Sequence, residues 1–233
     1  MNKSHVSVIL PAYNEGQTIG RMIAEVNQLA GQYQLEIIVA DGGSTDDTAA
    51  LARSSGAKVL EFPHKRGKGI DFWEAAKTAQ GDFVVQIDAD GQFSPKEIPL
   101  LVRPLEEGAE VAIARRMDHR RAPWVRTLGN KIFVTFTTII AQAKVYDVVA
   151  GFKAFRTPVL LSLDLLDAHF GYEGEIVVKA LRMGYKLVQV PVSYHPRAAG
   201  KSQVIPLRDG ARTIFSILKA RFGKLPPKAP ARH

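Results

Sequence analysis

Short apolar runs alternate with polar loops through the first half of the chain. Apolar, β-branched runs of this length, bounded by turn residues, are typical of buried strands, and they predict strands at residues 6–10, 35–40, 58–62 and 83–87. Helices are expected between them, over residues 19–29, from the second loop to about residue 55, and over residues 70–79. Pro11 is expected to end the first strand, and Ser44 or Thr45 to cap the second helix. The alternation predicts an α/β fold with a mostly parallel sheet covered by helices on both faces.

Three polar loops follow three of these strands. They contain Tyr13-Asn14-Glu15, Asp41-Gly-Gly-Ser44 and Asp88-Ala89-Asp90. Because parallel strands bring their carboxyl ends to one edge of the sheet, where open α/β sheets bind ligands, the loops are expected to converge there. Two carboxylates one residue apart can hold a hard divalent cation, since Mg²⁺ takes only one or two protein carboxylates. A plain turn, in which Asp and Gly are common, is the alternative, and the convergence favours the metal site.

The composition narrows the class of protein. With 233 residues and 46% hydrophobic content, one compact domain with a large core is expected, or two small ones. The chain has no cysteine, which excludes disulfides, thiolate metal sites and cysteine nucleophiles. A formal net charge of +8 suits an anionic partner, whether nucleotide phosphate, acidic lipid or nucleic acid. The histidines show no metal-ligand spacing.

The second half carries signals that bear on a membrane. No apolar run reaches the roughly 18–20 residues of a membrane-spanning helix, and the start lacks the pattern of a signal peptide. Apolar residues recur at helical spacing beside a stripe containing Arg208, Arg212 and Lys219; they are Leu207, Ala211, Ile214, Leu218 and Phe222. This pattern is typical of a basic amphipathic helix lying on anionic lipid, and a surface helix facing the core is the alternative. The Pro-rich residues 224–233 are expected to be disordered.

Several motifs resemble the family 2 glycosyltransferases with the Rossmann-like GT-A fold. They are Pro11-Ala-Tyr-Asn-Glu15, Asp41-Gly-Gly-Ser-Thr-Asp46, Gly67-Lys68-Gly69 and Asp88-Ala-Asp-Gly-Gln92. Residues 147–153, 172–175 and 191–202 are similar to the branch of dolichol-phosphate mannose synthases and polyprenyl-phosphate glycosyltransferases. The resemblance implies a catalytic domain over residues 1–205, followed by the amphipathic helix, 206–223, and the tail. One departure is Asp41-Gly42, where many relatives have Asp-Asp, and it leaves Asp41 in place.

The resemblance also implies a role for each loop. A GDP- or UDP-hexose donor would contact Pro11, Tyr13, Glu15, Asp41, Lys68, Asp88, Ala89 and Asp90. The diphosphate would carry Mg²⁺ or Mn²⁺, held by Asp88, Asp90 and Gln92. An acceptor phosphate would contact Arg115, Arg126, Arg197, Lys201 and Ser202. The residue types Arg, Lys and Ser suit a phosphate, through planar forks and hydroxyls, although most arginines are simply surface charges.

The implied reaction moves a hexose, mannose or glucose, to a polyprenyl or dolichyl phosphate with inversion by direct displacement. Such a phosphate is anionic near neutral pH and needs no general base, whereas a hydroxyl acceptor would need a carboxylate such as Glu173 or Glu175. Asp90, Glu175 and Arg197 are therefore the predicted catalytic residues, with Glu175 orienting the site if the acceptor is a phosphate. Asp147 is expected either to support the sugar site or to be a buried structural carboxylate.

Two other functions are alternatives to this reaction. The alternative within enzymes is transfer to a hydroxyl of a saccharide or small metabolite. A nucleotide-binding module without turnover is a different class, and the intact Asp88 and Asp90 argue against it. A nucleic-acid partner is not expected, because the basic residues accompany acidic loops rather than interleaved aromatic residues. We expect the protein in the cytoplasm, peripherally attached to the cytoplasmic face of an anionic membrane.

Overall fold

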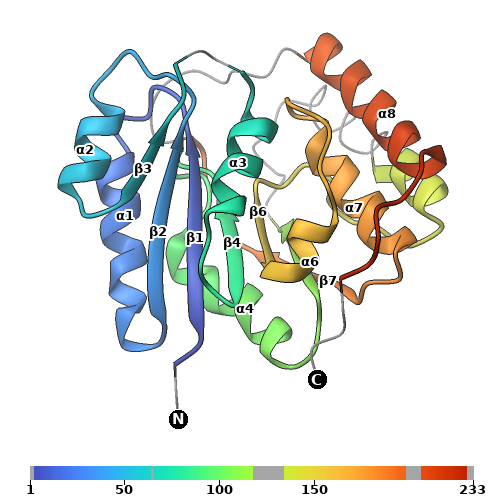
Figure 1. Cartoon of the computed structure of the whole chain (residues 1–233), viewed down its shortest axis with the longest axis horizontal. Helices are drawn as coiled ribbons and strands as arrows, with labels where there is room; N and C mark the ends of the chain where they lie inside the picture. The colour runs from blue at the N-terminus through green and yellow to red at the C-terminus, as the bar shows by residue number, and fades with distance from the viewer. Residues whose placement is uncertain (1–2, 64–65, 118–133, 198–205, 230–233) are drawn as a thin grey trace.

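The computed structural model describes residues 3–63, 66–117, 134–197 and 206–229. In these residues seven strands form one sheet in the order β3-β2-β1-β4-β6-β5-β7 (Figure 1). Their bounds are β1 (His5–Ala12), β2 (Gln34–Asp41), β3 (Lys58–Glu61), β4 (Phe83–Ile87), β5 (Val111–Arg116), β6 (Phe152–Arg156) and β7 (Leu187–Val192). Only β6 runs antiparallel to its neighbours in this sheet. The predicted α/β fold with a mostly parallel sheet is confirmed.

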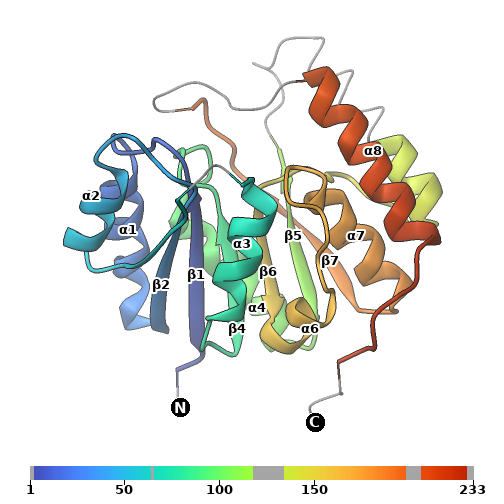
Figure 2. The same cartoon turned by 45° about the horizontal axis from the view of Figure 1, so that its top comes forward.

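Helices cover both faces of the sheet. They are α1 (Ile19–Asn27), α2 (Thr48–Ser54), α3 (Lys68–Lys77), α4 (Ile98–Glu106), α6 (Thr157–Ser162), α7 (Tyr172–Arg182) and α8 (Pro206–Phe222), with short 3-10 turns at η1 (Gln28–Gly31) and η2 (Pro95–Glu97). Residues 134–141 are also helical. One face carries α1, α2 and α4, and the other carries α3, α6 and α7, with α8 packed outside α7 (Figures 1 and 2).

Alternation along the strands builds a separate apolar core on each face. On β1, the fully buried Val8 and Leu10 pack with α1 and α4, whereas Ile9 packs with Phe72 of α3 on the opposite face. Successive side chains of a strand point to opposite faces, so a strand apolar at every position must be covered twice. Burying each such side chain is worth about 1.5–3 kcal/mol. These two cores fix the carboxyl ends of the strands, where the polar loops begin.

Two local predictions from the sequence are wrong. β1 continues through Pro11 to Ala12. Ala12 accepts a hydrogen bond from Gly42 on the β2 side, so the nitrogen of Pro11 points the other way, where pairing with β4 has already ended at Ile9. The second helix begins at Thr48 after Asp47, and neither predicted residue caps it.

α8 packs on α7 through a different face from the predicted apolar stripe. Its buried positions include Thr213, Ser216, Ile217 and Ala220, which are mostly small or polar. Gly174 of α7 makes room for this approach, because a Cβ there would lie 2.7 Å from the side chain of Ile217. Phe222, which the sequence predicted for the apolar stripe, is instead 76% exposed. Close backbone packing, and not the apolar stripe, therefore decides which side of α8 faces the core.

Residues 224–229 return along the body of the protein. Leu225 packs against the apolar core on the face of the sheet that α3, α6 and α7 cover. The Nζ of Lys228 lies 4.7 Å from the ring centroid of Tyr185, and Ala229 donates its N–H to the Tyr185 hydroxyl at 2.8 Å. Residues 224–229 thus contact the body of the protein, residues 230–233 lie outside the described part of the chain, and the disorder expected for the tail stays a prediction. Within the described part of the chain, no helix combines the length and apolar character needed to cross a membrane.

Candidate active site

The three polar loops converge at one edge of the sheet, as the sequence predicted. Asn14 donates its N–H to the Ser44 hydroxyl at 2.9 Å and accepts the N–H of Thr45 at 2.8 Å, which joins the first loop to the second. Asn14 has a φ of 56°, a left-handed conformation that Asn tolerates better than most residues. The Thr18 hydroxyl donates to the carbonyl of Ala89 at 2.7 Å and joins the first loop to the third.

One end of this edge gathers the residues predicted to contact the nucleoside. Asp41 is only 2% exposed and accepts the N–H of Ser44 at 3.1 Å, together with the Ser44 hydroxyl. Pro11 is buried at the end of β1, and Tyr13 is half-buried in the loop that follows. Nearby Asp71 accepts hydrogen bonds from Arg66, and burial raises the pKa of this carboxyl to about 6 in spite of the guanidinium.

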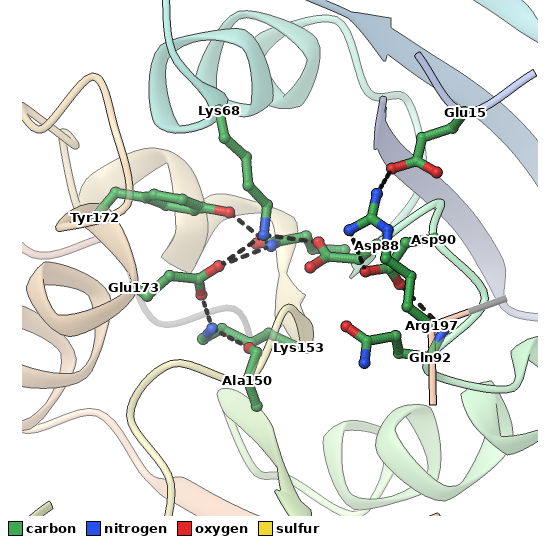
Figure 3. Close-up of polar contacts among 11 residues, drawn as sticks. Glu15, Lys68, Asp88, Asp90, Gln92, Ala150, Lys153, Tyr172, Glu173 and Arg197 are labelled. Carbon is green, nitrogen blue, oxygen red and sulfur yellow. Dashed lines mark hydrogen bonds and ion pairs between the residues drawn. The ribbon is translucent and has the colours of Figure 1, made fainter. Parts of the chain in front are cut away.

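The other end carries a compact group of charged side chains in the described residues, which we call the charge cluster (Figure 3). Its members are the carboxylates Glu15, Asp88, Asp90 and Glu173 and the basic side chains Lys68, Lys153 and Arg197. They come from the loops after β1, β4 and β7, from the starts of α3 and α7, and from β6. Parts of the chain far apart in sequence therefore meet at one site.

Arg197 links two carboxylates of the charge cluster. One guanidinium nitrogen lies 3.2 Å from Oδ2 of Asp90, and the other pairs with Glu15. Burial raises the pKa of Glu15 from its ordinary 4.5 to about 7, even though the guanidinium opposes the shift. The Arg197 segment is tied to the Asp90 loop by the N–H of His195, which donates to the carbonyl of Gln92 at 2.9 Å.

Lys68 links the other two carboxylates. Its Nζ lies 2.7 Å from Oδ1 of Asp88 and 3.1 Å from Oε1 of Glu173. Burial alone would lower the pKa of Lys68, but the charge and hydrogen bond of Asp88, together with Tyr172 and Asp90, outweigh burial, and the pKa is raised. Lys153 contacts the second oxygen of Glu173 from the fully buried interior. Burial, reinforced by the charge of Lys68, lowers the pKa of Lys153 to about 7.

Glycines allow the backbones around this site to approach closely. A Cβ at Gly67 would lie 2.2 Å from the carbonyl oxygen of Ala168, and one at Gly69 would lie 2.3 Å from that of Asp167. Gly67 also has a φ of 127°, which side-chain-bearing residues rarely adopt. The Gly-Lys-Gly motif thus presses the start of α3 onto residues 167–169 and directs Lys68 into the charge cluster.

The residues predicted to hold a metal ion suit Mg²⁺ or Mn²⁺. Burial, followed by the charge of Asp88, raises the pKa of Asp90, so two carboxylates lie close enough to repel, which a divalent cation relieves. Gln92 is held beside them, since its N–H donates to Oδ1 of Asp90 at 3.0 Å. The described residues contain no group of three His, Cys, Asp or Glu placed to hold an ion. Asp88, Asp90 and Gln92 alone would therefore leave coordination positions open, which suits a cation whose remaining ligands are diphosphate oxygens and water.

The structure does not bring Glu175 into the charge cluster. Its carboxylate accepts the N–H groups of Leu166 and Asp167 at 2.9–3.1 Å and pairs with Lys179 at 2.7 Å. Because helical neighbours two positions apart point in different directions, Glu173 enters the cluster and Glu175 supports the preceding loop. Of the two glutamates, Glu173 therefore lies among the residues predicted for the site, and Glu175 does not.

Other predicted residues lie apart from the charge cluster or outside the described residues. Arg115 lies over the ring of Tyr146, with its Cζ 4.2 Å from the centroid. Arg116 pairs with both oxygens of Asp147 at 2.6 and 2.9 Å, and Asp147 is only 1% exposed, which matches the structural alternative for this carboxylate. The structure describes none of the remaining predicted phosphate contacts, which are Arg126, Lys201 and Ser202.

Sequence reasoning missed three members of the site or its support. Lys153 is fully buried on β6, Gln86 donates to Glu173 at 3.3 Å and to the Tyr172 hydroxyl at 2.7 Å, and Thr18 holds the Ala89 carbonyl. A detectable signal existed for two of them. Gln86 is the one polar residue of β4, and Lys153 stands between apolar neighbours in β6; buried polar groups of this kind need internal partners.

Comparison with known proteins identifies the family. The family described as Glycosyl transferase family 2 matches residues 7–163. A dolichyl-phosphate hexose transferase of Haloferax volcanii is 27% identical over 216 residues, which cover 92% of this chain and 92% of that protein. The polyprenol monophosphomannose synthase of Mycolicibacterium smegmatis is 29% identical over 213 residues, 84% of this chain and 80% of the other.

A solved structure extends the comparison to a complex. Glucosyl-3-phosphoglycerate synthase from Mycobacterium tuberculosis, crystallised with Mn²⁺, UDP and phosphoglyceric acid, matches with a TM-score of 0.77 and 27% identity, over 96% of this chain and 80% of that one. The chain therefore belongs to glycosyl transferase family 2, and the resemblance stated from its motifs is confirmed. It is a glycosyltransferase with the GT-A fold.

Proposed function

We propose that this glycosyltransferase moves a hexose, mannose or glucose, from a GDP- or UDP-hexose to a polyprenyl or dolichyl phosphate, with inversion at the anomeric carbon. The observation that carries the acceptor class is the pairing within the charge cluster, where each carboxylate contacts a lysine or arginine. Such carboxylates suit a reaction that needs no general base, and a phosphate acceptor is already ionised near neutral pH. The names of the two relatives described above, a dolichyl-phosphate hexose transferase and a polyprenol monophosphomannose synthase, support the same class.

The donor would bind across the loops after β1, β2 and β4. Pro11, Tyr13 and Asp41 would contact the nucleoside, and Asp88, Asp90 and Gln92 would hold Mg²⁺ or Mn²⁺ at the diphosphate. When bound, the cation would stabilise the charge that develops on the leaving nucleoside diphosphate. The crystallisation of the structural neighbour with Mn²⁺ and UDP supports this assignment.

The acceptor phosphate would approach from the side of Arg197. Its guanidinium already spans Asp90 and Glu15, and a planar fork of this kind suits two oxygens of one phosphate. Lys201 and Ser202 follow Arg197 closely in the sequence and would add an ammonium and a hydroxyl to the same phosphate. Arg115 and Arg126 remain proposed contacts without a described link to the charge cluster.

The exposed face of α8 supports peripheral attachment to an anionic membrane. Phe215 and Phe222 are 69% and 76% exposed. Arg208, Arg212 and Lys219 stand three, four or seven positions from Phe215, which puts them on the same side of the helix. Two aromatic rings among three cations suit the boundary between acyl chains and acidic headgroups, on the cytoplasmic face.

A second candidate is transfer to the hydroxyl of a small acceptor. The structural neighbour was crystallised with phosphoglyceric acid. Glu15, with a pKa raised to about 7, is a carboxylate whose titration near neutral pH suits a general base. This candidate requires Glu15 to exchange its contact with Arg197 for the acceptor hydroxyl.

An acceptor comparison tests the proposal. UDP-glucose and GDP-mannose are each incubated with Mg²⁺ or Mn²⁺ and with polyprenyl phosphate, polyprenol or phosphoglyceric acid. We expect sugar transfer to the lipid phosphate with one donor and little or none to polyprenol. Transfer to phosphoglyceric acid or polyprenol, without transfer to polyprenyl phosphate, supports the hydroxyl candidate and contradicts the proposal.

A further inference from the structure

Lys68 has two carboxylate partners, and only one of them belongs to the proposed metal site. Its Nζ is 2.7 Å from Oδ1 of Asp88 and 3.1 Å from Oε1 of Glu173 (Figure 3). The Lys68 side chain is 18% exposed, so little water competes for the ammonium. Asp88 is a proposed metal ligand, whereas Glu173 lies behind it at the start of α7.

Glu173 is held firmly in place. Its second oxygen contacts the ammonium of Lys153, whose Nζ also donates to the carbonyl of Ala150. Its first oxygen accepts from Nε2 of Gln86 at 3.3 Å, and Gln86 is itself fixed by the Tyr172 hydroxyl. Because Glu173 is only 2% exposed and contacted on both oxygens, it is a fixed acceptor for Lys68.

The exchange of partners needs movement of the Lys68 side chain only. The backbone at Gly67 and Gly69 already lies close against residues 167–169, since a Cβ at either glycine would come within 2.3 Å of a carbonyl oxygen there. The side chain itself has four carbons and a mobile ammonium that readily changes partners. Because the ammonium already contacts both carboxylates, a short rotation would break its contact with Asp88 and keep the one with Glu173, with no change in the backbone.

We propose that Lys68 is a positioning residue that acts as an exchangeable counter-ion: its ammonium is shared between Asp88 and Glu173 in the metal-free protein, and it releases Asp88 and keeps only Glu173 when a divalent cation binds. This inference rests on the proposed function, because that function assigns Asp88 to the metal. A divalent cation on Asp88 would repel an ammonium that stays on the same carboxylate, because two positive charges would then lie a few ångströms apart. Glu173, with Lys153 behind it, gives the displaced ammonium a prepared partner beside the site.

The test measures Mn²⁺ binding, by titration with detection of free Mn²⁺ by electron paramagnetic resonance, with and without UDP. Lys68→Met removes the competing ammonium, so we expect about tenfold tighter Mn²⁺ binding without nucleotide. Lys68→Arg keeps the positive charge and should stay within about threefold of the wild type. Lys77→Met, on the exposed end of α3, is the matched control and should bind Mn²⁺ as the wild type does.

A double-mutant cycle separates exchange from simple charge repulsion. In the exchange account Glu173 acts on the metal only through Lys68, so Glu173→Gln should weaken Mn²⁺ binding in the wild type and have no effect in Lys68→Met. Equal weakening in both backgrounds would overturn the proposal. If Glu173→Gln does not fold, the comparison of Lys68→Met with Lys68→Arg decides, and equal affinities of these two variants would overturn it.

The same titration distinguishes this inference from the function on which it rests. Wild-type protein that binds Mn²⁺, with Lys68→Met no tighter, contradicts the exchange alone and leaves the metal site intact. Wild-type protein that binds no Mn²⁺, even with UDP present, contradicts the metal site of the proposed function and the exchange with it.

Discussion

The guanidinium of Arg197 lies 3.2 Å from the carboxylate of Asp90, although 107 residues separate them in the sequence. The contact joins the segment after β7 to the loop after β4. The second nitrogen of the same guanidinium pairs with Glu15 in the loop after β1. One arginine thus connects the side proposed for the acceptor to the side proposed for the donor.

Replacing Arg197 with alanine should mainly weaken the use of lipid phosphate. Loss of a charged hydrogen bond to phosphate is worth roughly 1.5–3 kcal/mol, so kcat/KM should fall about 10- to 100-fold, chiefly through KM for the lipid. Arg197→Lys should recover only part of this, because the planar fork is lost. Steady-state kinetics with varied polyprenyl phosphate measures both effects. Arg103→Ala, an exposed arginine on α4, is the control, and an Arg197→Ala variant with unchanged kinetics would refute the assignment.

The four strands of the first half and their loops could be predicted because local pattern determines them, whereas β5, β6 and β7 were not predicted. Phe83–Ile87 is apolar, short and bounded by turn residues, and β4 has these bounds. The convergence of the three loops then follows from parallel pairing. Pro11 misled the prediction because its effect depends on which side of β1 still has a partner, which only the assembled sheet determines.

The side-chain partners could not be predicted because they depend on packing between distant elements. Glu173 and Glu175 are equally plausible in sequence, and the direction in which α7 presents each one decides between them. The face of α8 depends on Gly174 of α7, which favours close backbone approach over burial of the apolar stripe. Lys153 lies on β6 and pairs with a buried carboxylate of α7, and this pairing between distant elements cannot be read from the sequence.

Exchanging each of the two glutamates of α7 for glutamine should separate structure from activity. Glu175→Gln breaks a buried pair with Lys179 and should lower the free energy of unfolding by on the order of 3 kcal/mol, with kcat of the folded protein nearly unchanged. Glu173→Gln should lower activity by altering the contacts of Lys68. Urea unfolding and kcat at a temperature where both variants fold provide the measurement. A folded Glu175→Gln variant with a rate loss of about 10²- to 10⁴-fold would instead indicate a general base.

Attachment to anionic liposomes should depend on the exposed face of α8. Replacing Phe215 and Phe222 together with serine removes two rings that would enter the acyl boundary, and binding should weaken at least about tenfold. Binding of the wild type should also fall with salt, because exposed charges are screened. Leu100→Ser, at a 45% exposed position on α4, is the matched control in a liposome sedimentation assay. Equal partition of the wild type to neutral and anionic liposomes at every salt concentration would contradict the membrane face.

The raised pKa of Glu15 predicts a pH dependence of stability. Between its ordinary value of 4.5 and the folded value of about 7, the folded protein retains a proton that the unfolded chain has released. The free energy of unfolding therefore falls as pH rises through this window, by roughly 3 kcal/mol at most. Glu15→Gln should lose this part of the pH dependence in urea unfolding at pH 5 and pH 8, whereas Glu25→Gln on α1 should keep it. An unchanged pH dependence in Glu15→Gln would show that another group is responsible.

The central claim is that the acceptor is a lipid phosphate, and the mass spectrum of the lipid extract tests it most directly. The protein is incubated with polyprenyl phosphate, Mg²⁺ and GDP-mannose or UDP-glucose, and the organic phase is analysed. We predict a lipid heavier by one hexose, which is absent with excess chelator and strongly reduced with Arg197→Ala. Sugar transferred only to a water-soluble acceptor such as phosphoglyceric acid, or a lipid product that forms fully in excess chelator, would contradict the account.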